Sequence, residues 1–186
     1  LNVWTDLEVE GPLPVMIYIH GGSNTGGWSY EPNYHGEQLA RQGMVVVSVA
    51  YRLGIFGWLN HPEMAIKNPA LHDLAASLAW VYEHIAAFGG DPERITVVGE
   101  SAGADNAIHL AISPLSQGRV RGLIQQSGGW SFDEGPDMPA AQSHALEFQR
   151  SLLGETGTLD GLRGIPSAQL LEAAGEGYSS FYFDPV

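Results

Sequence analysis

Apolar residues along the chain form two kinds of pattern, continuous runs and runs at helical spacing. Continuous apolar runs at 15–19 and 44–49 predict strands that are buried on both faces. Shorter strand-like stretches lie at 1–4, 95–98 and 121–126. Between 70 and 88 apolar residues recur at helical spacing, and the sequence GGDP at 89–92 ends this long helix. The alternation predicts an α/β fold with a mostly parallel sheet and helices on both faces.

Other segments complete this outline. Amphipathic patterns at 138–153 and 167–174 predict two helices, the second capped by Ser167. We expect the following features elsewhere: a turn at 11–14 that blocks strand pairing, a short helix at 36–42 closed by Gly43, and a loop at 51–60 that packs through its large apolar side chains.

The length of 186 residues suits one domain with a real core. We therefore predict a single domain over 1–186, with a sheet core at 1–130 and a helical segment at 131–186. The chain does not begin with Met, has no signal-peptide pattern at its start and stops at Asp184-Pro185-Val186 without a terminating motif. We accordingly expect a fragment.

The amino-acid composition argues against several kinds of binding partner and chemistry. The 21 acidic and 8 basic residues give a net charge of -13, which argues against nucleic acid or an anionic membrane as partner. No apolar run approaches the roughly 18 residues of a membrane helix. The absence of cysteine excludes disulfides and thiolate catalysis in this stretch. It favours a bacterial, disulfide-independent protein, either cytoplasmic or secreted.

A candidate catalytic motif lies at 99–103, GESAG, between a strand-like and a helix-compatible stretch. In the G-x-S-x-G pattern, a serine at a sharp strand-to-helix turn presents its hydroxyl to open space, and the glycines let strand and helix approach closely. With 24 glycines in the chain, the five-residue pattern alone also fits a chance loop. The flanking strand and helix favour the catalytic interpretation, with Ser101 as nucleophile.

A second candidate element follows the first buried strand. His20-Gly21-Gly22-Ser23 is glycine-rich and lies where that strand releases a loop over the sheet edge. Glycines allow such a loop to bring backbone N–H groups close to a ligand. An ordinary connecting loop is the alternative interpretation.

Several stretches together resemble type-B carboxylesterases, the group that includes the cholinesterases. These are PVMIYIHGG, YRLGIFGWL, NPALHDLAASLAWVYEHIAAFGGDPERITVVGESAGA and GLIQQSG, in this order, with looser matches at LRGIPSAQLLEAA and YFDPV. The resemblance implies an α/β-hydrolase fold, a small-molecule ester substrate, and no metal or organic cofactor. It also implies that Ser101 is acylated and that the N–H groups of Gly22, Ser23 and Ala102 form the oxyanion hole.

The resemblance extends to neighbouring residues. Glu100 matches an acidic position near the family's catalytic histidine, and His20 matches a position that orients the oxyanion turn. Arg52 and Asp73 match positions that form a structural ion pair in relatives. Asn24 replaces the family's usual aromatic residue, which leaves the shape of the acyl-side pocket open.

A serine nucleophile needs a base and an acid that orients the base. The histidines are His20, His35, His61, His72, His84, His109 and His144, and none follows a final strand, where the family's base belongs. Asp133 occupies a position where some other α/β hydrolases carry their acid. We expect the acid and histidine beyond Val186, so that these residues alone are weak or inert.

Alternatives remain open from the sequence. The chain could be a non-catalytic esterase-like binding domain, or a complete small hydrolase that uses one of its own histidines. Lipase, thioesterase or amidase specificity on the same scaffold also fits. Four aromatic residues suggest either a substrate gorge or ordinary core packing: Trp28, Phe56, Trp58 and Trp130.

Overall fold

A computed structural model of the protein describes residues 1–9, 11–128 and 137–175. The chain divides into two compact units, residues 1–51 with 71–130 and residues 52–70 with 131–186. Segment 52–70, which we placed with the sheet core, therefore clusters with the C-terminal helices. The prediction of one domain over 1–186 stays a prediction.

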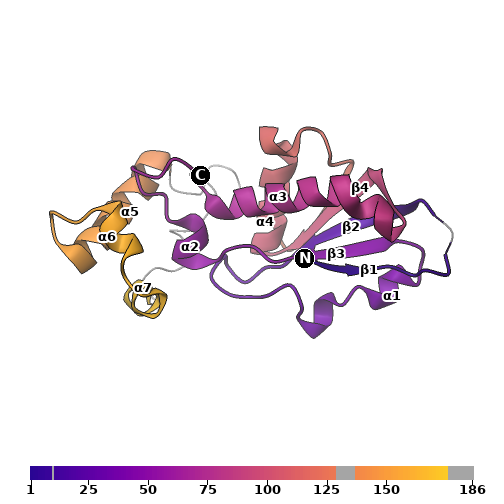
Figure 1. The fold of residues 1–186 in the computed structure, drawn as a ribbon, viewed down its shortest axis with the longest axis horizontal. Helices are drawn as coiled ribbons and strands as arrows, with labels where there is room; N and C mark the ends of the chain where they lie inside the picture. The colour runs from indigo at the N-terminus through magenta and orange to yellow at the C-terminus, as the bar shows by residue number, and fades with distance from the viewer. Residues whose placement is uncertain (10, 129–136, 176–186) are drawn as a thin grey trace. The chain divides into compact units, whose positions relative to one another are not determined.

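The first unit is built on a five-stranded sheet with the order β1-β3-β2-β4-β5 (Figure 1). Its strands are β1 (Asn2–Trp4), β2 (Leu13–Ile19), β3 (Val45–Val49), β4 (Gly90–Glu100) and β5 (Gly122–Gln126). Neighbouring strands are parallel except β1, which pairs antiparallel with β3. The predicted mostly parallel sheet is confirmed.

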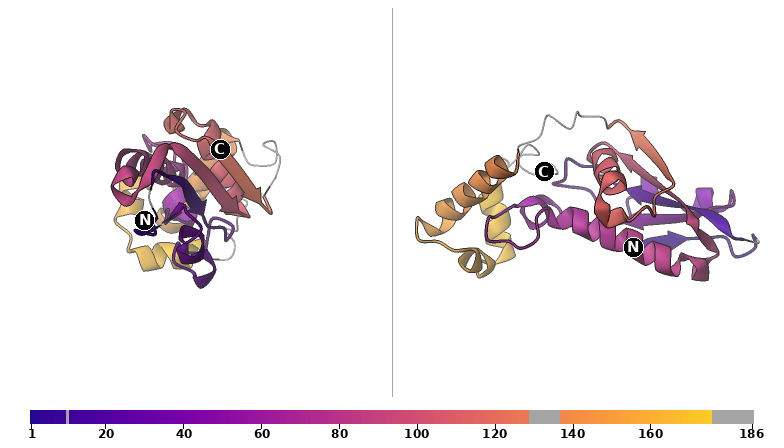
Figure 2. Two further views of the ribbon diagram at one scale, coloured as in Figure 1. Left: turned by 90° about the vertical axis from the view of Figure 1, so that its right-hand side faces the viewer. Right: turned by 90° about the horizontal axis from the view of Figure 1, so that it is seen from above.

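Burial follows from the position of each strand in the sheet. β3 is the second strand from the edge. All its residues are buried, including Ser48, as expected for a Val-rich strand with both faces covered. β5 lies at the edge of the sheet (Figure 2), and its Leu123 and Ile124 stay 38% and 48% exposed.

Two strands begin earlier than their apolar runs. β2 begins at Leu13, whose N–H donates to Gly89 O at 2.8 Å, so the predicted block to pairing at 11–14 is wrong for this residue. Pro14 has no N–H to donate, and the register shifts between Leu13 and Val15, where its ladder bond is missing. β4 begins at Gly90, inside the segment that we assigned to the end of the helix.

Helices pack along this sheet. α3 (Pro69–His84) runs beside it (Figures 1 and 2), continues as a 3-10 turn (Ile85–Phe88) and ends at Gly89, whose φ of 81° is left-handed. The helical spacing of Leu74, Leu78 and Val81 places all three in the core. Three shorter segments are α1 (Glu37–Ala40) and 3-10 turns at Pro32–Tyr34 and Pro114–Ser116. α4 (Ala102–Ile112) packs against β4, β5 and β2.

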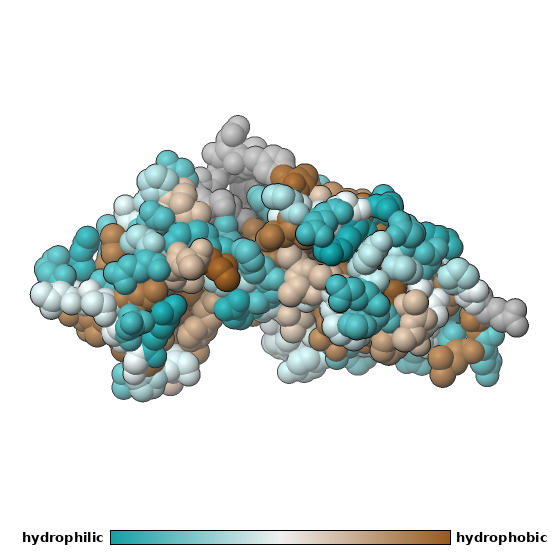
Figure 3. All heavy atoms as spheres, turned by 45° about the horizontal axis from the view of Figure 1, so that its top comes forward, coloured by the Kyte–Doolittle hydropathy of each residue, from teal (hydrophilic) through white to brown (hydrophobic). Residues whose placement is uncertain are grey.

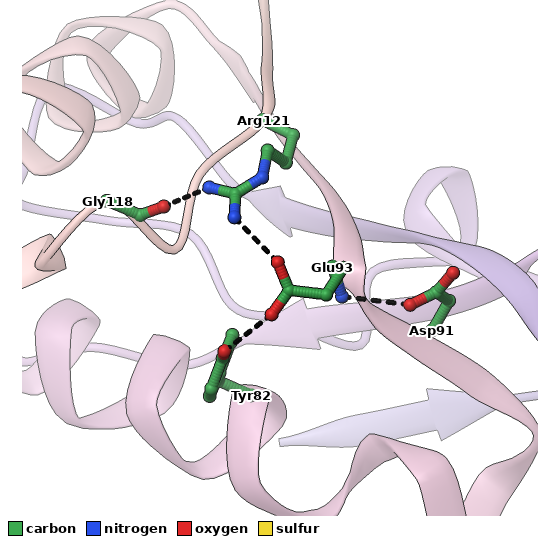
Figure 4. A network of polar contacts seen from close by, with 5 residues as sticks. All are labelled: Tyr82, Asp91, Glu93, Gly118 and Arg121. Carbon is green, nitrogen blue, oxygen red and sulfur yellow. Dashed lines mark hydrogen bonds and ion pairs between the residues drawn. The ribbon is translucent and has the colours of Figure 1, made fainter.

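An exposed polar network joins α3, β4 and the segment before β5 (Figure 4). Glu93 accepts from Tyr82 Oη and from Arg121 Nη2, each at 2.6 Å, and Arg121 also donates to Gly118 O. These two donors, Tyr82 first, lower the pKa of Glu93, while the carboxylate raises the pKa of Tyr82. Since its hydrogen bonds and the Glu93–Arg121 ion pair are exposed, we assign this network a minor role in stability.

The second unit contains α2 (Gly54–Trp58), α5 (Met138–Leu153), α6 (Leu159–Arg163) and α7 (Ser167–Ala174). α5 and α7 have the predicted bounds, whereas α2 lies in a segment predicted as loop and α6 was missed. Thr158 caps α6 by accepting from Gly161 N at 3.0 Å, a signal that was readable in the sequence. Ser167 is the first residue of α7 and makes no side-chain cap bond, so its predicted capping role is wrong.

Buried polar contacts and a cavity mark the interior of this unit. His61 is fully buried and bonds through Nε2 to Gln149 Oε1 of α5 at 2.7 Å, which joins segment 52–70 to the C-terminal helices. A cavity of about 550 Å³ is lined mostly by apolar side chains of α2, α5, α6 and α7, and also by Arg52 and Arg163.

The surface of the protein carries both apolar and hydrophilic residues. Apolar residues appear as brown patches among hydrophilic ones on the face drawn in Figure 3. Within the described ranges, no helix combines the length and apolar character needed to cross a membrane.

Candidate active site

Ser101 lies at the turn between β4, which ends at Glu100, and α4, which begins at Ala102. The predicted strand, turn and helix are confirmed. Ser101 has φ 54° and ψ -130°, a region that L-residues rarely adopt. Its N–H donates to Gln126 O at 2.8 Å and its carbonyl accepts from Ala104 N at 2.8 Å, so the neighbouring strand and the helix hold the strained turn.

The glycines of the motif are required by close backbone approach. A Cβ on Gly99 would collide with the carbonyl of Gly103, two residues beyond the serine. A Cβ on Gly103 would collide with the carbonyls of Ile19 and His20, where β2 ends. The pattern therefore serves to pack the turn after β4 against both α4 and the end of β2.

The loop after β2, which we call the oxyanion loop (residues 20–27), reaches Ser101. A Cβ built on Gly21 would lie 3.0 Å from Ser101 Cβ and 3.0 Å from Glu100 Oε2. Register explains the approach, because Ile19 pairs with Gly99 in the parallel ladder and both strands end at the same edge. The main chain of the loop therefore lies directly beside the side chain of Ser101.

Unpaired backbone donors occur both in this loop and at the start of α4. Gly22 and Ser23 have φ of 102° and 53°, and Ala102 is the first residue of α4. Among the described residues, no hydrogen bond is made by the N–H groups of Gly22, Ser23 and Ala102. Such N–H groups, with the positive end of a helix dipole, are suited to binding a negatively charged oxygen.

His20, the first residue of the oxyanion loop, supports the residues that follow it. It is 2% exposed, its Nδ1 donates to Gly21 O at 2.8 Å, and its ring stacks on Tyr51 with centroids 4.6 Å apart. Burial lowers the pKa of His20, against the opposing effect of the bond to Gly21. The neutral ring is thus suited to orienting the loop, as the resemblance implies.

Tyr51 is a supporting residue that the sequence analysis missed. Its hydroxyl donates to His20 O at 2.8 Å, directly before the glycine pair. It lies two residues after the end of β3 and is the first residue of the YRLGIFGWL stretch, so the resemblance could have drawn attention to it.

Glu100 faces two tyrosines as well as the oxyanion loop. The rings of Tyr18 and Tyr34 are tilted by 35° with centroids 4.7 Å apart, and the pKa of each hydroxyl is raised, first by burial and further by the negative charge of Glu100. The proposed role of Glu100 beside a catalytic histidine stays a prediction.

The other residues singled out from the sequence have varied surroundings. Arg52 donates from Nη2 to Pro69 O at 3.3 Å, and its pairing with Asp73 stays a prediction. Trp58 is buried, whereas Trp28 and Phe56 are 50% and 39% exposed. Trp130 and Asp133 lie outside the described residues.

All seven histidines lie in the described part of the chain, and within the first unit none of them hydrogen-bonds to Ser101. His35 contacts Tyr30 O at 3.3 Å, and His109 contacts Asp105 O within α4 at 2.7 Å. His84 packs against Trp80, with ring centroids 5.1 Å apart. The described contacts therefore supply no base for Ser101.

The parallel sheet, the strained serine after β4 and the glycine-rich loop after β2 define an α/β hydrolase. Comparison with known families gives the same class: the model of the carboxylesterase family matches residues 1–186. The chain belongs to this family.

Individual relatives agree with the family model. Para-nitrobenzyl esterase of Bacillus subtilis (strain 168) is 40% identical over 178 residues, covering 94% of this chain and 36% of the relative. Fumonisin B1 esterase of Sphingopyxis macrogoltabida is 44% identical over 137 residues, covering 69% of this chain and 25% of the relative. A solved structure of PNB esterase matches with a TM-score of 0.83 at 39% identity, over 92% of this chain and 37% of that one. The chain thus spans 25% to 37% of the length of these proteins.

Proposed function

We propose that the protein carrying this chain hydrolyses carboxylic esters through an acyl-enzyme on Ser101. The observation that carries the proposal is the approach of Gly21 to Ser101, with a Cβ-to-Cβ distance of 3.0 Å if Gly21 had a side chain. This approach supports a shared space for an ester carbonyl between the hydroxyl and the oxyanion loop.

In the proposed reaction, Ser101 Oγ attacks the ester carbonyl carbon while a base takes its proton. The carbonyl oxygen becomes an oxyanion that accepts from the N–H groups of Gly22, Ser23 and Ala102. Expulsion of the alcohol, which receives the proton, leaves an acyl-serine, and water then releases the acid. We propose that the base and its acid lie outside these 186 residues, since no histidine of the first unit hydrogen-bonds to Ser101.

Fluorophosphonate labelling of the whole protein tests this function. We expect a stoichiometric adduct on Ser101 by mass spectrometry and hydrolysis of p-nitrophenyl acetate that falls by about a million-fold in Ser101→Ala. A protein that takes up no label and cleaves no ester contradicts the proposal and supports a non-catalytic binding domain. Replacing each histidine of this chain in turn tests whether one of them serves as the base.

A further inference from the structure

A buried amide pair joins the oxyanion loop to the helix that begins beside Ser101. Asn106 Nδ2 of α4 donates to Asn24 Oδ1 at 2.7 Å, and the two residues are 0% and 1% exposed. Asn24 directly follows Gly22 and Ser23 in the loop, and Asn106 lies on the same helix as Ala102. The bond therefore connects the two elements that carry the three candidate oxyanion donors.

The loop needs such an external contact because its backbone conformation is unfavourable. Gly22, Ser23 and Asn24 have successive φ values of 102°, 53° and 57°. Within the loop, Thr25 N and Gly26 N both donate to Gly22 O at 3.0 Å, but this turn does not fix the loop relative to α4. Left-handed residues persist where the surroundings hold them, and Asn tolerates this region better than other residues with a side chain.

Tyr51 holds the start of the same loop. Its hydroxyl donates to His20 O at 2.8 Å. The loop is thus held at two points, at His20 by Tyr51 and at Asn24 by Asn106.

We propose that Asn24 and Asn106 are positioning residues that hold the N–H groups of Gly22 and Ser23 at the distance from Ser101 and Ala102 that an oxyanion requires. This inference rests on the proposed ester hydrolysis. It also gives Asn24 a role different from that of an aromatic pocket residue, because its buried side chain is directed to α4 rather than to open space.

The test compares Asn24→Gly, Asn106→Leu and the double variant in the whole protein. Glycine accepts a φ of 57° and removes only the amide, while leucine keeps the volume on α4 and removes the donor. The double variant removes both side-chain amides, so neither is left buried without its partner. It therefore keeps the test valid if a single variant folds poorly.

The readouts are kcat and KM for p-nitrophenyl acetate and the inhibition constant of a trifluoromethyl ketone, which forms an oxyanion on the serine. We expect kcat and ketone affinity to fall together by about ten-fold or more, with KM within about two-fold, because displaced donors weaken only the charged state. We expect kcat and ketone affinity of the double variant to be no lower than those of the less active single variant, because both substitutions remove the same hydrogen bond.

The chain contains a matched control. Asn60 Nδ2 donates to Asn68 Oδ1 at 2.8 Å, both residues are buried, and Asn68 has a φ of 47°. Asn68→Gly, Asn60→Leu and their double variant remove a buried amide pair of the second unit, together with the bond from Asn68 N to Asn60 Oδ1 at 2.7 Å, and are expected to retain kcat.

The outcomes separate the inference from the function on which it rests. Wild-type kcat and ketone affinity in the double variant, or equal losses in the control variants, overturn the positioning role while leaving ester hydrolysis intact. A wild-type protein whose Ser101 takes up no fluorophosphonate overturns both.

Discussion

Gly21 lies so close to Ser101 that a Cβ on the glycine would be 3.0 Å from the Cβ of the serine and 2.7 Å from Glu100 O. The main chain of the oxyanion loop therefore runs directly beside the proposed nucleophile. This proximity explains the glycine after His20 without reference to φ, because the requirement is for space.

Gly21→Ala is expected to lower kcat by about a hundred-fold, because the new methyl group must push the oxyanion loop away from Glu100 and Ser101. Steady-state kinetics with a p-nitrophenyl ester measures this loss. Gly26→Ala is the control: a Cβ there has its nearest neighbour, Gly22 O, at 3.9 Å. Equal activity of both alanine variants would show that the loop does not need the close approach.

The hydrogen bond between Tyr82 and Glu93 gives a prediction about a pKa rather than about catalysis. Tyr82 is the largest cause of the lowered pKa of Glu93, so Tyr82→Phe should move this pKa upward, towards its ordinary value. A carboxyl titration by NMR detects the change. Because the lowered pKa favours the folded state above the ordinary range of a Glu carboxyl, this contribution fades as the pH falls through the folded pKa. An unshifted titration in the variant would contradict the assigned cause.

The part of the site that could be predicted from sequence is local in the chain. The turn at Ser101 is marked by glycines within two positions of it, and Gly99 meets the carbonyl of Gly103 in the same turn. Gly103, in contrast, meets the carbonyls of Ile19 and His20, which the motif alone does not reveal. Likewise, β3 was predictable because four of its five residues are Val, which favours a strand buried on both faces.

The missed features depend on partners distant in sequence. The bond between Asn24 and Asn106 spans 82 residues, and that between Tyr51 and His20 spans 31. Such contacts follow from strand register and helix rotation, which no single segment specifies. The early start of β2 is a similar case, since Leu13 extends the strand only because Gly89 O lies opposite its N–H.

The buried His20 predicts a dependence of stability on pH. Its pKa is lowered below 6.5 in the folded protein, so between these values the unfolded chain binds more protons than the folded one. The free energy of unfolding should therefore be constant above about pH 6.5 for this group and decrease as the pH falls below it. Urea unfolding of wild type and His20→Gln from about pH 8 to about pH 5 measures the difference. Parallel pH profiles of the two proteins would show that His20 is not protonated preferentially in the unfolded chain.

Ser101→Gly should stabilise the protein while it abolishes ester hydrolysis. Ser101 has φ 54° and ψ -130°, and a non-glycine residue in such a region costs about 1 to 3 kcal/mol. Glycine removes this strain but adds about 0.5 to 1 kcal/mol of conformational entropy to the unfolded chain, so the expected net gain is about 1 kcal/mol. Ser101→Ala separates the two effects, because it loses the hydroxyl and keeps the strained backbone. Denaturant unfolding should therefore give the glycine variant a higher midpoint than the alanine variant, with both inactive. If the two midpoints coincide, the turn at Ser101 stores no strain that glycine can relieve.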